Sequence, residues 1–289
     1  MSDIRRVSMA VCICTFRRPD ELARLLRGLD EQSFPADVAV NLALIVVDNS
    51  PGREAERVCS QYSGRWRLLY LVEPRTGISH ARNTSLAAVS DDCDFIAMID
   101  DDEVPDPGWL ASLLEVQQRS GADVVVGRTR PAFPTATPGW VEETGFFLKP
   151  RNQDDLAEMD PNPPAATCNV MIDVALLREP GLAFDPALGL SGGEDKMLFQ
   201  SLKQQGRRFA WAPDARVTEF IPPERARLSY MLRESYRRGW VVHRIKLGLK
   251  SRSALHSLKI VLKLLVRSLL GFLGNTLMML LNLARGRAA

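Results

Sequence analysis

Residues 95–103 read FIAMIDDDE, an apolar run that ends in four adjacent carboxylates. The apolar half is typical of a buried β-strand, and the acidic half is typical of the turn that ends it. Adjacent carboxylates repel one another, and a bound divalent cation relieves that repulsion. Because Mg²⁺ and Mn²⁺ prefer oxygen ligands, the stretch predicts a cation site at the end of a strand. The alternative is a solvated acidic turn, which the buried strand before it and Pro105 after it disfavour.

Apolar runs on both sides of this stretch alternate with segments of helical periodicity. The predicted strands are residues 7–15, 42–47, 68–72, 95–99, 123–128 and 208–217, and the first half of 168–177. The predicted helices are residues 54–63, 78–89, 109–118 and 194–205, a helix capped by Thr15 that carries Leu22 to Leu29, and the second half of 168–177. This alternation predicts an α/β domain with a mostly parallel mixed sheet flanked by helices.

Three polar motifs follow successive predicted strands: Asp48, the Pro74–Gly77 loop and the Asp100–Asp102 cluster. In parallel sheets, ligands bind beyond the carboxyl ends of the strands. We therefore expect the three motifs to share one edge of the sheet and one binding site.

Two further motifs carry groups suited to chemistry. Gly77 permits a tight turn before a helix start, where anions bind, and Arg82 on that helix is expected to pair with an acid, with a phosphate, or in a surface salt bridge. Later, the sequence GGED (192–195) opens a predicted helix. Its carboxylates, Glu194 and Asp195, are either simple helix caps or include a general base for an acceptor hydroxyl.

Residues 130–165 break the alternation with a proline-rich, irregular sequence that contains Trp140, Phe146 and Phe147. Apolar side chains in a long loop predict a flap that packs over something. We expect a domain at 1–224, with a first half at about 1–128 and a second half at about 129–224. Residues 225–289 are expected to form a helical tail.

Taken together, these motifs resemble those of glycosyltransferase family 2, an inverting family with the GT-A fold. The resemblance covers about residues 7–220 and rests on the order of VCICTFRRP, VVDNS, GISHARN, IDDDE, CNVMID and GGED. The likeness is strongest to bacterial glucosyltransferases of the succinoglycan exopolysaccharide type. It implies transfer of a hexose from a nucleotide-sugar donor, with UDP as the expected nucleotide. It also implies that the half at about 1–128 binds the nucleotide sugar and that the half at about 129–224 binds the acceptor.

The resemblance also implies a role for each matching residue. Asp48 is expected at the nucleobase, Asp102 on the Mg²⁺ or Mn²⁺ ion, and Asp195 as the catalytic base that Glu194 orients. Asp100 is expected at the ribose and at the metal. The residues implied in donor binding are Thr15, Arg17, Asp48, Gly77, Arg82, Asp100 and Asp101.

The sequence departs from the family pattern in two places. Three consecutive aspartates leave open which two form the D-x-D pair. The Gln-x-x-Arg-Trp motif of processive synthases is absent, which favours the addition of one sugar per acceptor. Glu219 lies where some relatives have a further polar site residue.

The C-terminal tail is strongly basic. Residues 225–289 contain 14 Lys or Arg and one acid, so the tail carries about +13 and the preceding residues about −11. A cationic stripe on an apolar helix, Arg252, His256, Lys259, Lys263 and Arg267, predicts attachment to an anionic membrane surface. A helix buried against the domain and a transmembrane span within 255–284 are the alternatives. Nucleic-acid binding is not expected, because aromatic stacking residues are missing from the stripe.

These features predict a protein at the inner face of the cell membrane that acts on a lipid-linked or saccharide acceptor. Scattered cysteines and the lack of a recognisable signal peptide favour the cytoplasm. Two other functions stay open at this point. A nucleotidyltransferase would use a similar metal site, although TFRRPDE (15–21) lacks the glycine-rich loop, and a membrane scaffold would keep the fold without catalysis.

Overall fold

The computed structural model describes residues 4–134, 137–149, 153–178 and 182–250, and Leu262. The chain forms two units, residues 1–232 and 233–289. The predicted stripe from Arg252 to Arg267, and the apolar stretch after it, lie outside the described residues.

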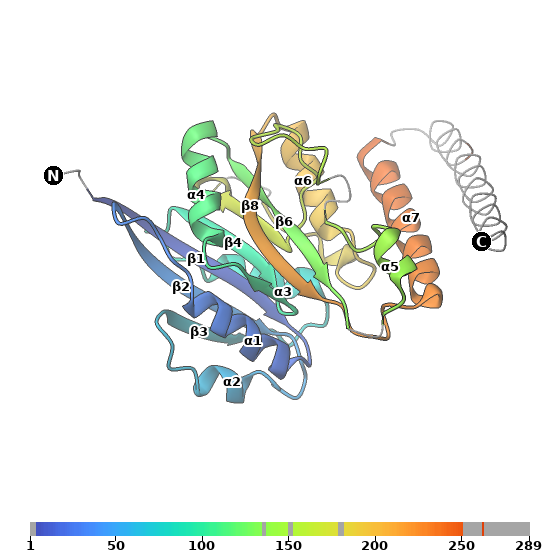
Figure 1. The fold of residues 1–289 in the computed structure, drawn as a ribbon, viewed down its shortest axis with the longest axis horizontal. Coiled ribbons are helices and arrows are strands. Elements are labelled where there is room, and N and C mark those ends of the chain that lie inside the picture. The colour runs from blue at the N-terminus through green and yellow to red at the C-terminus, as the bar shows by residue number, and fades with distance from the viewer. Residues whose placement is uncertain (1–3, 135–136, 150–152, 179–181, 251–261, 263–289) are drawn as a thin grey trace. The chain divides into compact units, whose positions relative to one another are not determined.

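An eight-stranded mixed sheet forms the centre of the first unit (Figure 1). In spatial order its strands are β3 (Arg67–Val72), β2 (Val38–Asp48), β1 (Arg5–Thr15), β4 (Phe95–Asp100), β7 (Asn169–Asp173), β6 (Val124–Ala132), β8 (Phe209–Phe220) and β5 (Glu103–Pro105). The first four are mutually parallel, as are β6 and β8, whereas β7 is antiparallel to both of its neighbours. The predicted mostly parallel mixed sheet is confirmed.

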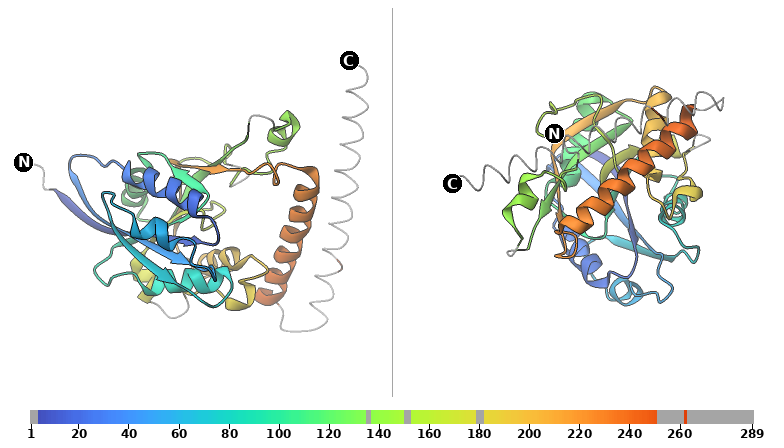
Figure 2. Two further views of the ribbon diagram at one scale, coloured as in Figure 1. Left: turned by 90° about the horizontal axis from the view of Figure 1, so that it is seen from below. Right: turned by 90° about the vertical axis from the view of Figure 1, so that its right-hand side faces the viewer.

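Helices cover both faces of this sheet. One face packs against α1 (Pro19–Asp30), α2 (Glu56–Ser60) and α4 (Trp109–Ser120), and the other against α3 (Ile78–Ala87) and α6 (Glu194–Gln204). The left view of Figure 2 shows the blue helix α1 on one side of the strands and α3 and α6 on the other. Alternate side chains of β1 divide between the two cores: Val11 and Ile13 point to the first face, and Ala10 and Cys12 to the second.

The register of the strands brings the polar motifs to one edge. Thr15 pairs with Asp48 across β1 and β2, and Cys14 pairs with Asp100 across β1 and β4. The carboxyl ends of these strands therefore lie level with one another, as the sequence predicted. The expected capping role of Thr15 is wrong, because α1 begins at Pro19 and the Thr15 hydroxyl instead donates to Asp101.

Several elements differ from the predicted ones. The helix expected at 54–63 is the shorter α2, and the helix expected within 168–177 is the 3₁₀-helix η1 (Val174–Arg178). The short edge strand β5, the helix α5 (Gly139–Glu143) and the 3₁₀-helix η2 (Pro186–Leu188) were not predicted. Within the irregular 130–165 region, Phe146 and Phe147 are buried in a small apolar cluster, which agrees with a packed flap.

The helix predicted after residue 225 is α7 (Leu228–Lys250). Glu234 on this helix accepts hydrogen bonds from Arg237 and Arg238. No helix within the described part of the chain combines the length and apolar character that crossing a bilayer requires.

Candidate active site

The acidic cluster occupies the turn between β4 and β5. Asp101, Asp102 and Glu103 are buried, whereas the Asp100 side chain is 37% exposed. Glu103 accepts a hydrogen bond from the Asp100 backbone amide at 3.0 Å, which closes the turn. Burial and the nearby Asp100 charge raise the pKa of Glu103 well above its usual value. The turn therefore concentrates negative charge where water is scarce, and positive partners must compensate it.

The first compensating cation is Arg18, from the loop before α1. Its guanidinium donates to Asp101 Oδ1 at 2.9 Å and to Asp102 Oδ2 at 2.8 Å. The Thr15 hydroxyl donates to the other Asp101 oxygen at 2.9 Å. Burial raises the pKa of Asp101 to about 6, although Arg18 works against that shift. Asp101 is thus a structural centre of the turn, held from two sides by the segment that follows β1.

Two further cations lie on the other side of Asp102. Arg225 donates to Asp102 Oδ2 at 3.3 Å and lies 3.5 Å from Glu219 Oε1. Lys149, from the flap, pairs with Glu219 Oε2 at 2.8 Å and lies 3.8 Å from Glu103. Sequence reasoning flagged Glu219 but missed the three cations, because basic residues are common and their pairing depends on the tertiary fold.

Arg82 connects the acidic cluster to the GGED motif. Its guanidinium lies 3.6 Å from Asp100 Oδ1 and pairs with Glu194 Oε1, and both Arg82 and Glu194 are buried. Burial raises the pKa of Glu194, and Arg82 opposes the rise. The other oxygen of Glu194 is buried and has no hydrogen-bond partner among the described residues. The structure thus brings together the predicted site residues Arg82, Asp100 and Glu194. Of the pairings expected for Arg82, it shows the buried ion pair with an acid.

Asp195 follows Glu194 at the start of α6. It is only partly buried, and its Oδ1 accepts from the Lys196 backbone amide at 2.6 Å. Gly192 and Gly193 adopt positive φ angles of 78° and 94°, so the chain turns sharply into the helix. This turn places an accessible carboxylate next to the buried Arg82–Glu194 pair, as a general base requires.

The start of α3 is fixed against the loop before the GGED motif. The Ile78 amide donates to Gly189 O at 3.1 Å, and the Ser79 hydroxyl donates to Asp185 O at 2.8 Å. Gly77 precedes the helix with a φ of 128°, a backbone conformation that favours glycine. Its amide donates to Asn49 Oδ1 at 3.0 Å. Gly77 therefore shapes the loop through its backbone.

Asn49 is a site-building residue that sequence reasoning passed over. Its side-chain amide donates to Glu73 O at 2.7 Å and to Arg75 O at 2.8 Å. With its bond from Gly77, it ties the end of β2 to the whole loop between β3 and α3. Its position directly after Asp48 was the available signal.

Asp48 is buried with no exposed area. Its Oδ1 accepts from the Ser50 amide at 2.8 Å, and its Oδ2 accepts from the Ala55 amide at 2.9 Å and the Tyr70 hydroxyl at 3.1 Å. In this structure Asp48 organises the turn after β2. Its expected contact with a nucleobase stays a prediction, and it requires one of these bonds to open.

Arg17 lies next to that turn with a positive φ of 57°. Its amide donates to Ser50 Oγ at 2.8 Å, while its side chain is 62% exposed and 3.7 Å from Glu54. The strained backbone is held by a specific hydrogen bond, and the cationic side chain is largely exposed beside Glu54.

The carboxylates fit a divalent cation whose coordination a ligand completes. In the described part of the chain, no group of three or more His, Cys, Asp or Glu has the arrangement of a metal site. Mg²⁺ is often bound through only one or two protein carboxylates, with phosphate oxygens and water as its other ligands. Asp100 is accessible, whereas Asp102 would have to exchange an arginine for the ion.

Comparison with known proteins supports a common fold and family. The protein-family model described as "Glycosyl transferase family 2" matches residues 10–179 of this chain. Among curated proteins, the chain is 33% identical to the succinoglycan biosynthesis protein ExoM of Rhizobium meliloti, over 78% of this chain and 71% of that protein. It is 22% identical to the glucosyl-dolichyl phosphate glucuronosyltransferase of Haloferax volcanii, over 81% and 75% of the two chains.

Solved structures agree in fold. S. aureus TarS 1–349 in complex with UDP-GlcNAc has a TM-score of 0.61 at 15% identity, covering 90% of this chain and 72% of that one. The mannosyltransferase PcManGT from Pyrobaculum calidifontis, in complex with GDP-Man and Mn²⁺, has a TM-score of 0.60 at 18% identity, covering 90% and 70%. The chain spans 43% of the longer S. aureus TarS chain. At these identities the likeness shows the fold alone, which is the predicted GT-A fold.

Proposed function

Because the chain belongs to glycosyltransferase family 2, we propose that it transfers a hexose from a nucleotide-diphosphate sugar to a saccharide or lipid-linked acceptor, with inversion at the anomeric carbon. The observation that carries this proposal is the Arg82 bridge. One guanidinium joins Asp100 of the acidic cluster to Glu194 of the GGED motif. A cation site and a base on opposite sides of one donor are what a single in-line displacement needs.

The donor is held, in this proposal, along the edge formed by β1, β2 and β4. Thr15, Asp48 and Asp100 end these strands, and their register is level. The exposed cationic side chain of Arg17 supplies charge for the phosphates. Asp48 takes the nucleobase once it gives up a bond from the turn that it organises. UDP is the nucleotide we expect, and the two solved relatives were bound to UDP-GlcNAc and to GDP-Man.

Asp195 is the proposed base. It is the more accessible carboxylate of its pair, and it stands next to the Arg82–Glu194 pair, which fixes the start of α6. Its carboxylate accepts the proton of the acceptor hydroxyl while that oxygen attacks the anomeric carbon and the nucleoside diphosphate departs. Glu194 helps to position the Asp195 carboxylate through its ion pair with Arg82. Its own protonation state does not need to change during the reaction.

Asp102 and Asp100 are the proposed ligands of a Mg²⁺ or Mn²⁺ ion. When bound, the ion neutralises charge on the departing diphosphate. Arg18 and Arg225 pair with Asp102, and in this proposal the two guanidinium groups turn to the phosphate oxygens when the donor binds. Asp101 keeps its hydrogen bond from the Thr15 hydroxyl and stabilises the turn between β4 and β5.

The acceptor and the cellular site are proposed from the tail and from the relatives. The ExoM relative is named for succinoglycan biosynthesis, which favours an exopolysaccharide intermediate as acceptor. The basic segment after residue 225 favours attachment at the cytoplasmic face of the membrane, where lipid-linked intermediates present their sugars. Family membership decides for sugar transfer over the nucleotidyltransferase and scaffold alternatives.

The experiment is an assay of nucleoside diphosphate release. The full chain is incubated with UDP-glucose, UDP-galactose, UDP-GlcNAc, UDP-glucuronate or GDP-mannose, each with Mn²⁺ or with EDTA, and with a lipid extract as acceptor source. We expect one UDP-sugar to be turned over in Mn²⁺ and not in EDTA. Turnover that is equal in EDTA contradicts the proposed cation, and no turnover of any donor contradicts the proposed function.

A further inference from the structure

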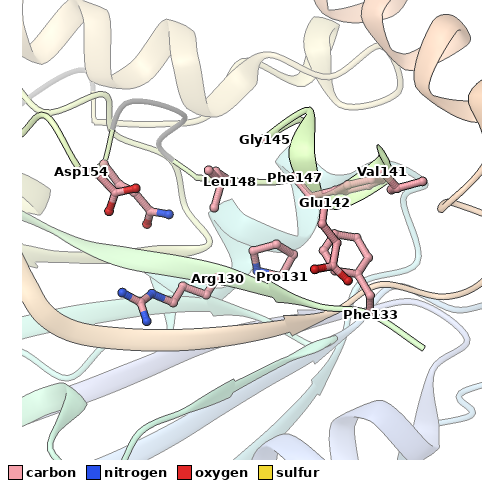
Figure 3. Close-up of a pocket in the computed structure, with 10 residues that line it drawn as sticks. Arg130, Pro131, Phe133, Val141, Glu142, Gly145, Phe147, Leu148 and Asp154 are labelled. Atoms are coloured by element: carbon pink, nitrogen blue, oxygen red, sulfur yellow. The ribbon is translucent and has the colours of Figure 1, made fainter. Parts of the chain in front are cut away.

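The segment after β6 encloses a pocket that contains none of the predicted site residues. Its volume is about 300 Å³, at the lower end of the range for small-molecule pockets. Arg130 and Phe133 line it from the end of β6, Glu142 from α5, and Gln153 and Asp154 from the later part of the flap. Figure 3 shows Asp154 and Leu148 on one side of the hollow and Glu142 and Phe133 on the other.

Gln153 is the first sign that this pocket takes a ligand. Its side chain is 2% exposed, and the Oε1 atom is buried without a hydrogen-bond partner among the described residues. Its backbone carbonyl accepts from Arg128 at 3.4 Å, so the residue is held in place. A buried amide oxygen without a donor destabilises the folded state, and such groups persist where a ligand satisfies them. Because Gln153 also lines the pocket, a ligand hydroxyl there is a candidate for the missing donor.

The walls indicate the class of ligand. Phe133 and Phe147 pack edge to face with ring centres 5.6 Å apart, and Phe147 belongs to a buried apolar cluster, so this wall is rigid. Glu142 and Asp154 add carboxylates, and Asp154 is 3.3 Å from Arg128. Aromatic carbon beside hydrogen-bond acceptors suits a sugar ring, which has an apolar face and donating hydroxyls. With Arg130 against the two carboxylates, the lining keeps a net charge of −1, which disfavours a phosphate or nucleotide at the same place.

We propose that this pocket binds one neutral pyranose ring of the saccharide acceptor. The inference rests on the proposed function, because the acceptor of a glycosyltransferase carries sugar. A connection to the acidic cluster runs through the flap. Leu148 lines the pocket, and the next residue, Lys149, pairs with Glu219 and approaches Glu103. A sugar in the pocket would therefore contact the flap segment whose next residue, Lys149, approaches the acidic cluster.

The test is saturation-transfer difference NMR on the full chain with cellobiose, laminaribiose, gentiobiose, maltose and lactose as probes. Glu142→Ala and Gln153→Leu remove the polar groups of the pocket. Glu143→Ala is the matched control, because Glu143 is the next residue of α5 and does not line the pocket. We expect at least one disaccharide to bind the wild type and the control, with affinity at least fivefold weaker in the two pocket variants.

Gln153→Leu also separates binding from folding. Since it removes a buried oxygen without a partner, we expect an unchanged or higher melting temperature alongside the lost affinity. If this variant fails to fold, Glu142→Ala decides alone, because Glu142 is exposed. No binding of any probe, or equal binding by wild type and Glu142→Ala, overturns the pocket.

Nucleoside diphosphate release, measured in the same preparations, keeps the two proposals apart. Turnover of a donor without saccharide binding overturns the pocket and leaves the proposed function standing. Saccharide binding that depends on Glu142, without turnover of any donor, supports the pocket and contradicts the proposed function.

Discussion

Arg82 of α3 and Glu194 of α6 form a buried ion pair between residues 112 positions apart in the chain. The pair joins the half of the domain that carries the strand-end motifs to the half that carries the GGED motif. A buried pair of this kind contributes less to stability than to fixing geometry, because desolvation offsets most of the attraction. Its main effect is to set where Asp100 and Asp195 stand.

Removing one partner of this pair should be costly. Arg82→Leu leaves the Glu194 charge buried and unpaired, and we expect the free energy of unfolding to fall by about 3–5 kcal/mol. In Arg82→Leu/Glu194→Gln the loss should be smaller than the sum of the single losses. Urea unfolding of Arg82→Leu, of Glu194→Gln and of the double variant gives the three losses. The control is Arg119→Leu, which breaks an exposed pair with Glu158 and should cost about 0–1 kcal/mol. Equal losses at the two sites would show that the buried pair does not organise the fold.

The proposed cation site predicts that removing one arginine raises the affinity for Mn²⁺. Arg225 donates to a carboxylate oxygen of Asp102, the residue that we assign to the ion. Arg225→Gln should therefore bind Mn²⁺ more tightly than the wild type when no donor is present, by severalfold. Electron paramagnetic resonance of free Mn²⁺ gives the affinity directly. Arg216→Gln, which changes an exposed arginine paired with Asp214, should leave it unchanged. Weaker Mn²⁺ binding by Arg225→Gln would mean that Asp102 is not the ligand.

Acid should weaken the loop between β3 and α3. Hydrogen bonds from Arg75, and then from Thr84, lower the pKa of buried Glu73 to about 2, below its ordinary 4.5. The unfolded chain takes up this proton near pH 4.5 and the folded chain only near pH 2, so the stability that ionised Glu73 provides is complete above pH 4.5 and is lost between pH 4.5 and 2.

Because Arg75 is largely exposed, we expect a contribution of about 1–2 kcal/mol. Glu73→Gln should cost this amount in urea unfolding at pH 7 and markedly less at pH 2.5, where most of the linked stability has been lost. Glu115→Gln, at an exposed glutamate of α4, serves as the control. A cost for Glu73→Gln that does not change with pH would rule out the linkage.

Much of the fold follows from local patterns in the chain. Apolar runs such as 42–47 favour a buried strand because they are short and rich in β-branched residues. Their polar ends lie at one edge because parallel strands share a direction. The cross-chain register of Thr15 with Asp48 is a consequence of that rule. The exact helix limits did not follow, since the short helix α2 yields to the turn that Asp48 builds.

The sequence predicted the acidic residues of the site but not its basic residues. Four consecutive carboxylates are rare enough to be noticed, whereas Arg18, Lys149 and Arg225 are ordinary residues until the fold brings them to the cluster. Asn169 shows the same limit. It sits in the CNVMID motif, but its task is structural: it accepts from Trp109 and donates to carbonyls of β6 and β8. Only tertiary contacts separate such residues from catalytic ones.

The central claim is that Asp102 and Asp195 act on one donor molecule. The decisive measurement is the kcat of nucleoside diphosphate release with the preferred donor and Mn²⁺, for wild type, Asp102→Asn, Asp195→Asn and the exposed control Asp214→Asn. We predict that both site variants lose about 10²–10⁴-fold in kcat while they keep the far-UV spectrum of the folded protein at the assay temperature, and that the control is unchanged. A folded Asp195→Asn protein with kcat within twofold of the wild type would contradict the account.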